Sequence, residues 1–203
     1  PMVIAPPKEF ETGLNIRGLA GAVAQPATLA VLLAVILNNM SIVAFMSMAP
    51  LYFEEVKGFS PRLTGLGFSL FLIGGAIMAP FAGYISDKIG RKTMAIGGLV
   101  GGGICALLIP FVSIDIAIFP LLIITGTLML AVRSVIIAIA LEKIGHREST
   151  VLGLISSLGD GFAALGAVLA GITGEMDLGF ALILAAILSV LAGLTILPLN
   201  QSD

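Results

Sequence analysis

Two ionisable residues, Arg133 and Asp160, lie within long apolar stretches of this 203-residue chain. A charge at the centre of a membrane-spanning helix costs about 2.5 to 3.5 kcal/mol on insertion scales, so neither side chain is expected to face lipid. An ion pair facing a water-filled cavity would lower the cost of both. Asp160 could then bind a proton or another cation, and Arg133 could contact an anion or tune Asp160. A pair that only locks helix packing is the alternative.

Two adjacent amides, Asn38 and Asn39, lie near the centre of another apolar stretch. A buried amide in a helix bundle is often only a hydrogen bond between helices, worth about 0.6 kcal/mol. The other interpretation is that these amides bind a polar substrate. We therefore treat Asn38, Asn39, Arg133 and Asp160 as candidates for a substrate or ion pathway.

The composition identifies the elements that must position these residues. Apolar residues make up 58% of the chain and charged residues only 11%, where an ordinary soluble domain carries roughly 25%. Too few charges remain to cover a soluble surface, so the chain is predicted to be an integral membrane protein. The net charge is −2 and the sequence has no block of basic residues, so a nucleic-acid-binding protein is not indicated.

Six apolar runs are long enough to cross a bilayer, which needs about 20 residues per helix. They cover residues 27–53, 63–85, 93–113, 117–140, 150–174 and 178–199. Their continuous apolar character excludes the alternation of a β-barrel, so the sequence predicts an all-α membrane protein with a six-helix transmembrane domain over 27–199. The remaining segments are a tail or linker at 1–26 and a short tail at 200–203.

Lysine and arginine are unevenly divided between the two sides of these spans. Because short cytoplasmic loops are enriched in both, the side with seven of them is predicted to be cytoplasmic, and both termini lie there. The seven are Lys8, Arg17, Lys88, Arg91, Lys92, Lys143 and Arg147, against Lys57 and Arg62 on the other side.

The turn between the second and third runs carries a glycine- and charge-rich motif: Gly83, Asp87, Gly90, Arg91 and Lys92. Gly83 would let a neighbouring helix approach, and Gly90 would permit a tight reversal. Asp87 is placed to accept from backbone N–H groups at the next helix start. Arg91 could pair with Asp87 or with a carbonyl end across the bundle. The alternative is an ordinary positively charged turn.

This string resembles the Gly-x-x-x-Asp-x-x-Gly-Arg-Arg/Lys signature of the major facilitator superfamily, which joins the second and third helices of a six-helix half. The resemblance implies a second half that this chain lacks, so the partner is an N-terminal six-helix half or a second copy. Two departures from the pattern of the family's N-terminal half favour the C-terminal half. The basic residue of the fourth span, Arg133, comes later in the chain, and Ile137 stands where that pattern has a glycine. The fifth span lacks the pattern's proline. In that fold the first and fourth helices line the cavity, and the third and sixth, here without charge or amide, lie outside.

The resemblance implies a secondary active transporter that moves a small solute by alternating access, with proton coupling as one form. The loop motif would latch the cytoplasmic face in one state. No nucleophile with its base, no Walker loop and no metal-ligand cluster is present in the sequence, so neither an enzyme, a cofactor nor a metal is expected. A non-transporting membrane interaction module with the same fold is the alternative.

Overall fold

The computed structural model describes residues 25–144 and 148–199. The predicted tails at 1–26 and 200–203 therefore lie almost wholly outside the described residues. The same is true of three of the cations used to predict the orientation, Lys8, Arg17 and Arg147.

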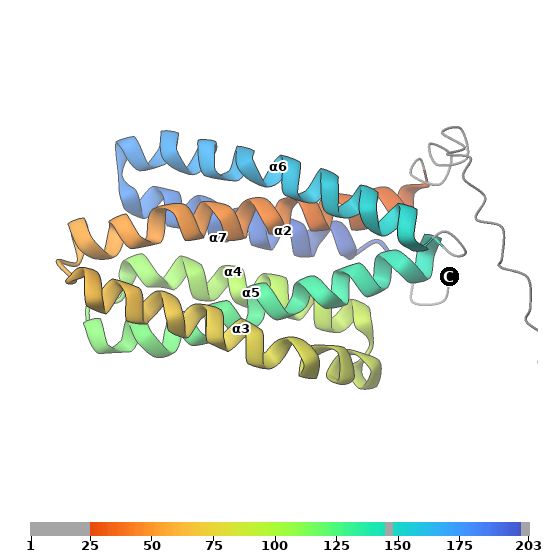
Figure 1. The fold of residues 1–203 in the computed structure, drawn as a ribbon, viewed down its shortest axis with the longest axis horizontal. Coiled ribbons are helices and arrows are strands. Elements are labelled where there is room, and N and C mark those ends of the chain that lie inside the picture. Colours follow the sequence, from red (N-terminus) through yellow and green to blue (C-terminus); the bar gives the residue numbers. More distant parts are fainter. Residues whose placement is uncertain (1–24, 145–147, 200–203) are drawn as a thin grey trace, which may run out of the picture.

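Six long helices run back and forth along one axis of the described part of the chain (Figure 1). Each is long and apolar enough to cross a membrane, which confirms the predicted all-α, six-span architecture. Two of them end in a short segment of different pitch, the π-helix η1 (Tyr52–Val56) after α2 and the 3₁₀ turn η2 (Ile109–Phe111) after α4. The long helices are α2 (Pro26–Leu51), α3 (Pro61–Ile89), α4 (Arg91–Leu108), α5 (Asp115–Ile144), α6 (Glu148–Met176) and α7 (Leu178–Ile196).

Local sequence signals explain where several helices begin. The Ser60 hydroxyl accepts a hydrogen bond from the Leu63 amide, and Pro61 follows at the first helical position of α3. Asp177 caps α7 by accepting from the Gly179 amide at 2.6 Å. Between α3 and α4 the chain turns at Gly90, whose φ of 93° a residue with a Cβ rarely adopts, so the predicted tight reversal is confirmed.

The helices pack in two connected groups. Helix α2 packs against α6 and α7, α5 packs against α3 and α4, and α4 joins the groups by packing against α7. Helices α3 and α6 lie on the flanks and are the least buried of the six (Figure 1). The apolar window of α7 is more than half buried in this six-helix unit.

Small residues allow the closest of these contacts. A Cβ at Gly98 or Gly102 of α4 would collide with Val132 or Met129 of α5. A Cβ at Gly97, on the same helix, would meet no atom within 4 Å. Gly98 and Gly102 therefore support close packing of α4 on α5, whereas Gly97 does not.

Buried apolar side chains form two separate clusters along the length of the bundle. One includes Val31, Leu99 and Ile136, and the other includes Phe45 and Leu122. On α2 the stretch Asn38–Ser41 separates them, since Val35 belongs to the first cluster and Ile42 to the second. On α2 the polar residues Asn38, Asn39 and Ser41 thus lie between the two apolar clusters.

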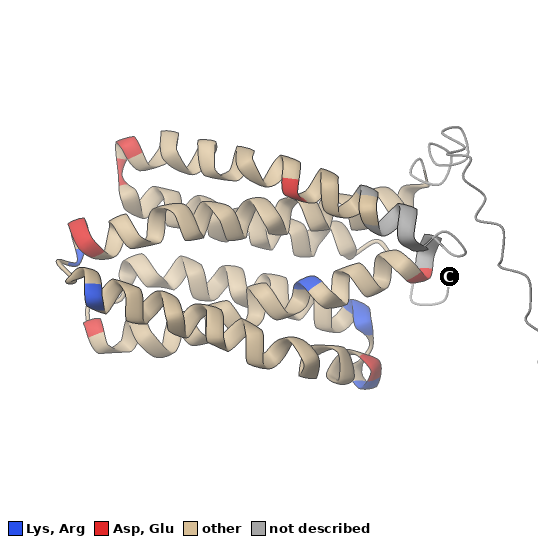
Figure 2. Cartoon of the chain, viewed as in Figure 1, with Lys and Arg blue, Asp and Glu red and all other residues tan. Residues whose placement is uncertain are grey.

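Charged residues lie mainly at the two ends of the bundle (Figure 2). We name them the basic end, with Lys88, Arg91 and Lys92, and the acidic end, with Glu54, Glu55, Asp115, Glu175 and Asp177. Figure 2 also shows one basic position on α5 and one acidic position on α6 near the middle of the bundle.

Candidate functional site

Three of the four predicted pathway residues meet around one carboxylate in the middle of the bundle. Oδ1 of Asp160 accepts from the Arg133 guanidinium at 3.1 Å and from the Asn39 amide at 3.2 Å. The predicted ion pair is therefore present, and Asn39 joins it. We call Asn39, Arg133 and Asp160 the mid-bundle cluster.

Each member of the mid-bundle cluster comes from a different helix. Asn39 is near the middle of α2, Arg133 is on α5, and Asp160 is on α6. Helices α5 and α6 are consecutive in the chain, whereas α2 is far from both in the sequence and packs closely on α6. The cluster thus depends on tertiary packing, because no local turn could assemble it.

The mid-bundle cluster is open on one side. The side chains of Arg133 and Asp160 are 43% and 63% exposed in this six-helix unit, while Asn39 is buried. Exposed charge in the middle of a membrane-spanning bundle must face water or another protein surface, since lipid would leave it unsolvated. The exposed sides of Arg133 and Asp160 therefore need water or another protein surface to solvate them.

Asn38 lies apart from the mid-bundle cluster. Its side chain is fully buried, and neither amide atom has a hydrogen-bond partner among the described residues. It belongs to the most buried stripe of α2, with Ala34, Ser41 and Phe45, because residues three and four apart share a helix face. The structure thus brings Asn39, but not Asn38, into contact with the Arg133–Asp160 pair.

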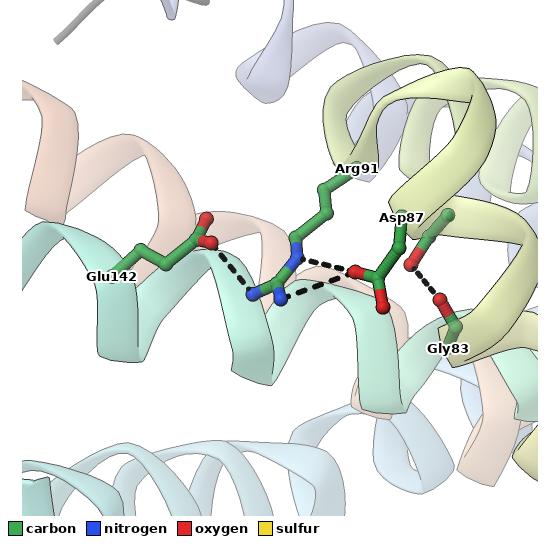
Figure 3. Close-up of polar contacts among 5 residues, drawn as sticks. Gly83, Asp87, Arg91 and Glu142 are labelled. Carbon is green, nitrogen blue, oxygen red and sulfur yellow. Dashed lines mark hydrogen bonds and ion pairs between the residues drawn. The ribbon is translucent and has the colours of Figure 1, made fainter.

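A second arginine–carboxylate cluster lies at the basic end. Figure 3 shows Arg91 between Asp87 and Glu142, with contacts of 3.2 Å to Asp87 Oδ1 and 2.9 Å to Glu142 Oε1. Asp87 is four residues before Arg91, whereas Glu142 comes from α5. Arg91 therefore ties the α3–α4 turn to the end of another helix. We call Asp87, Arg91 and Glu142 the basic-end cluster.

The structure corrects two expectations for the loop motif. The start of α4 has no side-chain cap, and Asp87 accepts from the Arg91 side chain instead of from backbone N–H groups. Asp87 lies in the last turn of α3 and Arg91 is the first residue of α4, so the turn at Gly90 brings the two side chains together. Among the described residues no helix packs closely on Gly83 either, since a Cβ there would meet no atom within 4 Å. Its carbonyl accepts from the Ser86 hydroxyl (Figure 3).

Lys92, rather than Arg91, contacts the carbonyl groups at the end of a helix across the bundle. Its ammonium donates to the carbonyl oxygens of Leu197 and Leu199, just beyond α7. A cation at this place satisfies carbonyl groups that the helix leaves free and interacts favourably with its negative end.

Two residues that the sequence reasoning missed complete these clusters. Glu142 is the acidic partner of Arg91. It lies at the end of the fourth span, on the same side of the membrane as the loop motif, and that position could have identified it as a partner. Gly159 lies directly before Asp160, where a Cβ would collide with the Asn39 amide. A glycine beside an intramembrane carboxylate was the signal in that case.

These features define the class of protein: a six-span helical membrane protein with a charged turn after the second span and a polar cluster in the middle. The sequence model of the Major Facilitator Superfamily matches residues 31–203. The chain belongs to the major facilitator superfamily and is an integral membrane protein.

One curated relative is an uncharacterized MFS-type transporter, YfnC, of Bacillus subtilis (strain 168). It is 30% identical over 102 residues, which cover 50% of this chain and 25% of the relative. The chain thus matches about a quarter of the length of that relative.

Proposed function

We propose that the protein is a secondary active transporter of a small solute and that this chain supplies one six-helix half. Family membership and the name of the relative support transport in general. The observation that carries the proposal is the mid-bundle cluster, in which an arginine–aspartate pair lies half exposed between two apolar regions. Such a charge is costly without water, so its presence favours a pathway over a packing role.

In this proposal Asp160 binds and releases a proton, and Arg133 stabilises its charged form. Protonation would weaken the ion pair and so change the relative stability of two conformations. Arg133 would then become free to contact an anionic group of the solute. Asn39 would keep the carboxyl group in place in both states.

The open face of the cluster requires a second body to enclose the solute. The partner is an N-terminal six-helix half or, alternatively, a second copy of this chain. Rocking of the two halves around the mid-bundle cluster would give alternating access. The basic-end cluster would hold that end of the bundle closed in one of the two states, as its link between the α3–α4 turn and α5 supports.

A vesicle experiment tests the proposal. The intact protein is reconstituted with a pH-sensitive dye inside, and small solutes are screened for proton movement that depends on the solute. We expect at least one solute to drive proton movement, and Asp160→Asn to abolish it. Asp115→Asn, at the exposed start of α5, is the matched carboxylate control and should behave like the parent.

Solute movement that is equal in the parent and in Asp160→Asn would contradict a coupling role for Asp160. The absence of transport of any solute by the intact protein would favour a non-transporting interaction module.

We further propose that the basic end faces the cytoplasm, together with both termini. Single cysteines at Lys57 and Asp177, at the acidic end, should react with an impermeant reagent added outside cells. A cysteine at Lys88 should react only after permeabilisation. The reverse pattern would overturn this orientation.

A further inference from the structure

Glycines flank Asp160 on both sides, but their surroundings differ. A Cβ at Gly159 would lie 2.8 Å from Nδ2 of Asn39 and 3.0 Å from a methyl carbon of Val35. A Cβ at Gly161 would meet no atom within 4 Å. Only Gly159 therefore leaves space that another residue of the mid-bundle cluster uses.

That space gives the Asn39 amide its path to the carboxylate. The amide passes over Gly159 and donates to Oδ1 of Asp160, the same oxygen that accepts from Arg133. Among the described residues, Oδ2 has no hydrogen-bond partner, and the side chain is 63% exposed. One carboxylate oxygen is thus held by two donors, and the other is left open.

We infer that Gly159 is a positioning residue for the carboxyl group of Asp160. By admitting Asn39, it keeps two donors on Oδ1 and leaves Oδ2 as the oxygen that takes up a proton from water. The inference rests on the proposed role of Asp160 as a proton site.

The charged surroundings of Asp160 are simple enough for a clean test. Arg133 on α5 is the charged group that faces it. Helices α2 and α7, which also pack against α6, contain no titratable residue between Pro26 and Leu51 or between Leu178 and Ile196. A change in Asn39 or Gly159 therefore acts on the carboxyl group without altering a neighbouring charge.

The experiment is a pH titration of the purified, intact protein followed by infrared difference spectroscopy, with the proton itself as the probe. The carbonyl band of the protonated Asp160 carboxyl group is assigned by its loss in Asp160→Asn. Its midpoint pH is then compared in the parent, Gly159→Ala, Asn39→Ala, the double variant of these two, and Gly161→Ala as the matched control.

We expect the midpoint in Gly159→Ala to differ from that of the parent, because the hydrogen bond from Asn39 to the carboxylate is lost. Asn39→Ala should give the same change. The double variant should change no further, since both substitutions remove one contact. Gly161→Ala should titrate like the parent. Folding of Gly159→Ala should persist, because its closest contact is the movable end of the Asn39 side chain.

Equal midpoints in Gly159→Ala and Gly161→Ala would overturn the positioning role and leave the proton site intact. If Gly159→Ala fails to fold, an unchanged midpoint in Asn39→Ala overturns the inference by itself. If the parent has no titrating band that Asp160→Asn removes, the proposed proton site and this inference both fall.

Discussion

The two arginine–carboxylate clusters of this chain have similar contact distances but lie at different positions along the bundle. Arg91 contacts its carboxylates at 2.9 and 3.2 Å at the end of the bundle, and Arg133 contacts Asp160 at 3.1 Å in its middle. All the carboxylates involved are more than half exposed in the six-helix unit. Distance and exposure alone therefore do not distinguish the clusters, but depth in the membrane does.

At the basic end, bulk water is available to every charge, and an exposed ion pair is worth only about 0 to 1 kcal/mol. In the middle of the bundle the same charges need water or a partner that the protein must supply. The comparison teaches that the basic-end cluster can be a modest structural tie, whereas losing one partner should cost more in the mid-bundle cluster. The variants below follow that contrast from the largest expected effect to the smallest.

The largest effect is expected from Asp160→Asn, which leaves Arg133 as an unpaired cation in the middle of the bundle. Breaking one partner of a buried pair costs about 3 to 5 kcal/mol, and water beside the half-exposed pair should reduce that cost. The yield of membrane-inserted protein and its thermal stability should both fall. The double variant Asp160→Asn with Arg133→Gln should restore both without restoring proton movement.

Proton-driven transport by the double variant would show that Asp160 is not the coupling residue and would leave a packing role for the pair. A single variant as stable as the parent would mean that Asp160 does not offset the charge of Arg133.

A smaller effect is expected at the basic end. Asp87→Asn weakens one charge-assisted contact of Arg91, while the contact to Glu142 remains. Solute transport should fall by up to about fivefold, in line with the upper end of the range of about 0 to 1 kcal/mol for an exposed ion pair. Membrane insertion should be unchanged. If Asp87→Asn transports at the parent rate, the loop motif determines only the orientation of the chain in the membrane.

The smallest effects are expected when each of the two adjacent amides, Asn38 and Asn39, is replaced by leucine. Asn38 is buried without a hydrogen-bond partner among the described residues, so Asn38→Leu removes an unsatisfied group there and should leave thermal stability equal to the parent or higher by about 1 kcal/mol. Asn39→Leu removes a donor to Asp160 and should lower transport. If Asn38→Leu abolishes transport and Asn39→Leu does not, the wrong amide has been assigned to the cluster.

The sequence predicted the fold and the ion pair for identifiable physical reasons. Membrane spans follow from length and hydropathy, and two opposite charges within apolar helices have few ways to avoid lipid other than pairing. The choice between Asn38 and Asn39 was not predictable, because adjacent residues point about 100° apart and the face of α2 that meets α6 is set by packing. Glu142 was missed for a similar reason, since its partner lies on another helix.

The distribution of polar residues along the chain was a useful guide to the helices of the cluster. Polarity in the first, fourth and fifth spans pointed to the helices that contribute Asn39, Arg133 and Asp160. The third and sixth spans, without charge or amide, correspond to α4 and α7, which contribute no residue to the mid-bundle cluster. Helix α7 packs instead against α2 and α4.

The central claim is that the mid-bundle cluster faces water rather than lipid, and thiol accessibility tests it most directly. Ala164 is exposed one turn beyond Asp160 on α6, and Ile187 is exposed near the middle of α7, which has no charged residue. Single cysteines are placed at each in a Cys105→Ser background of the intact protein. A water-soluble, impermeant thiol reagent then reports the surroundings, because thiols react as hydrated thiolates.

We predict that the cysteine at position 164 reacts readily and that the cysteine at position 187 does not. Lack of reaction at 164, with normal insertion and intact transport, would place the Arg133–Asp160 pair away from water and contradict the account.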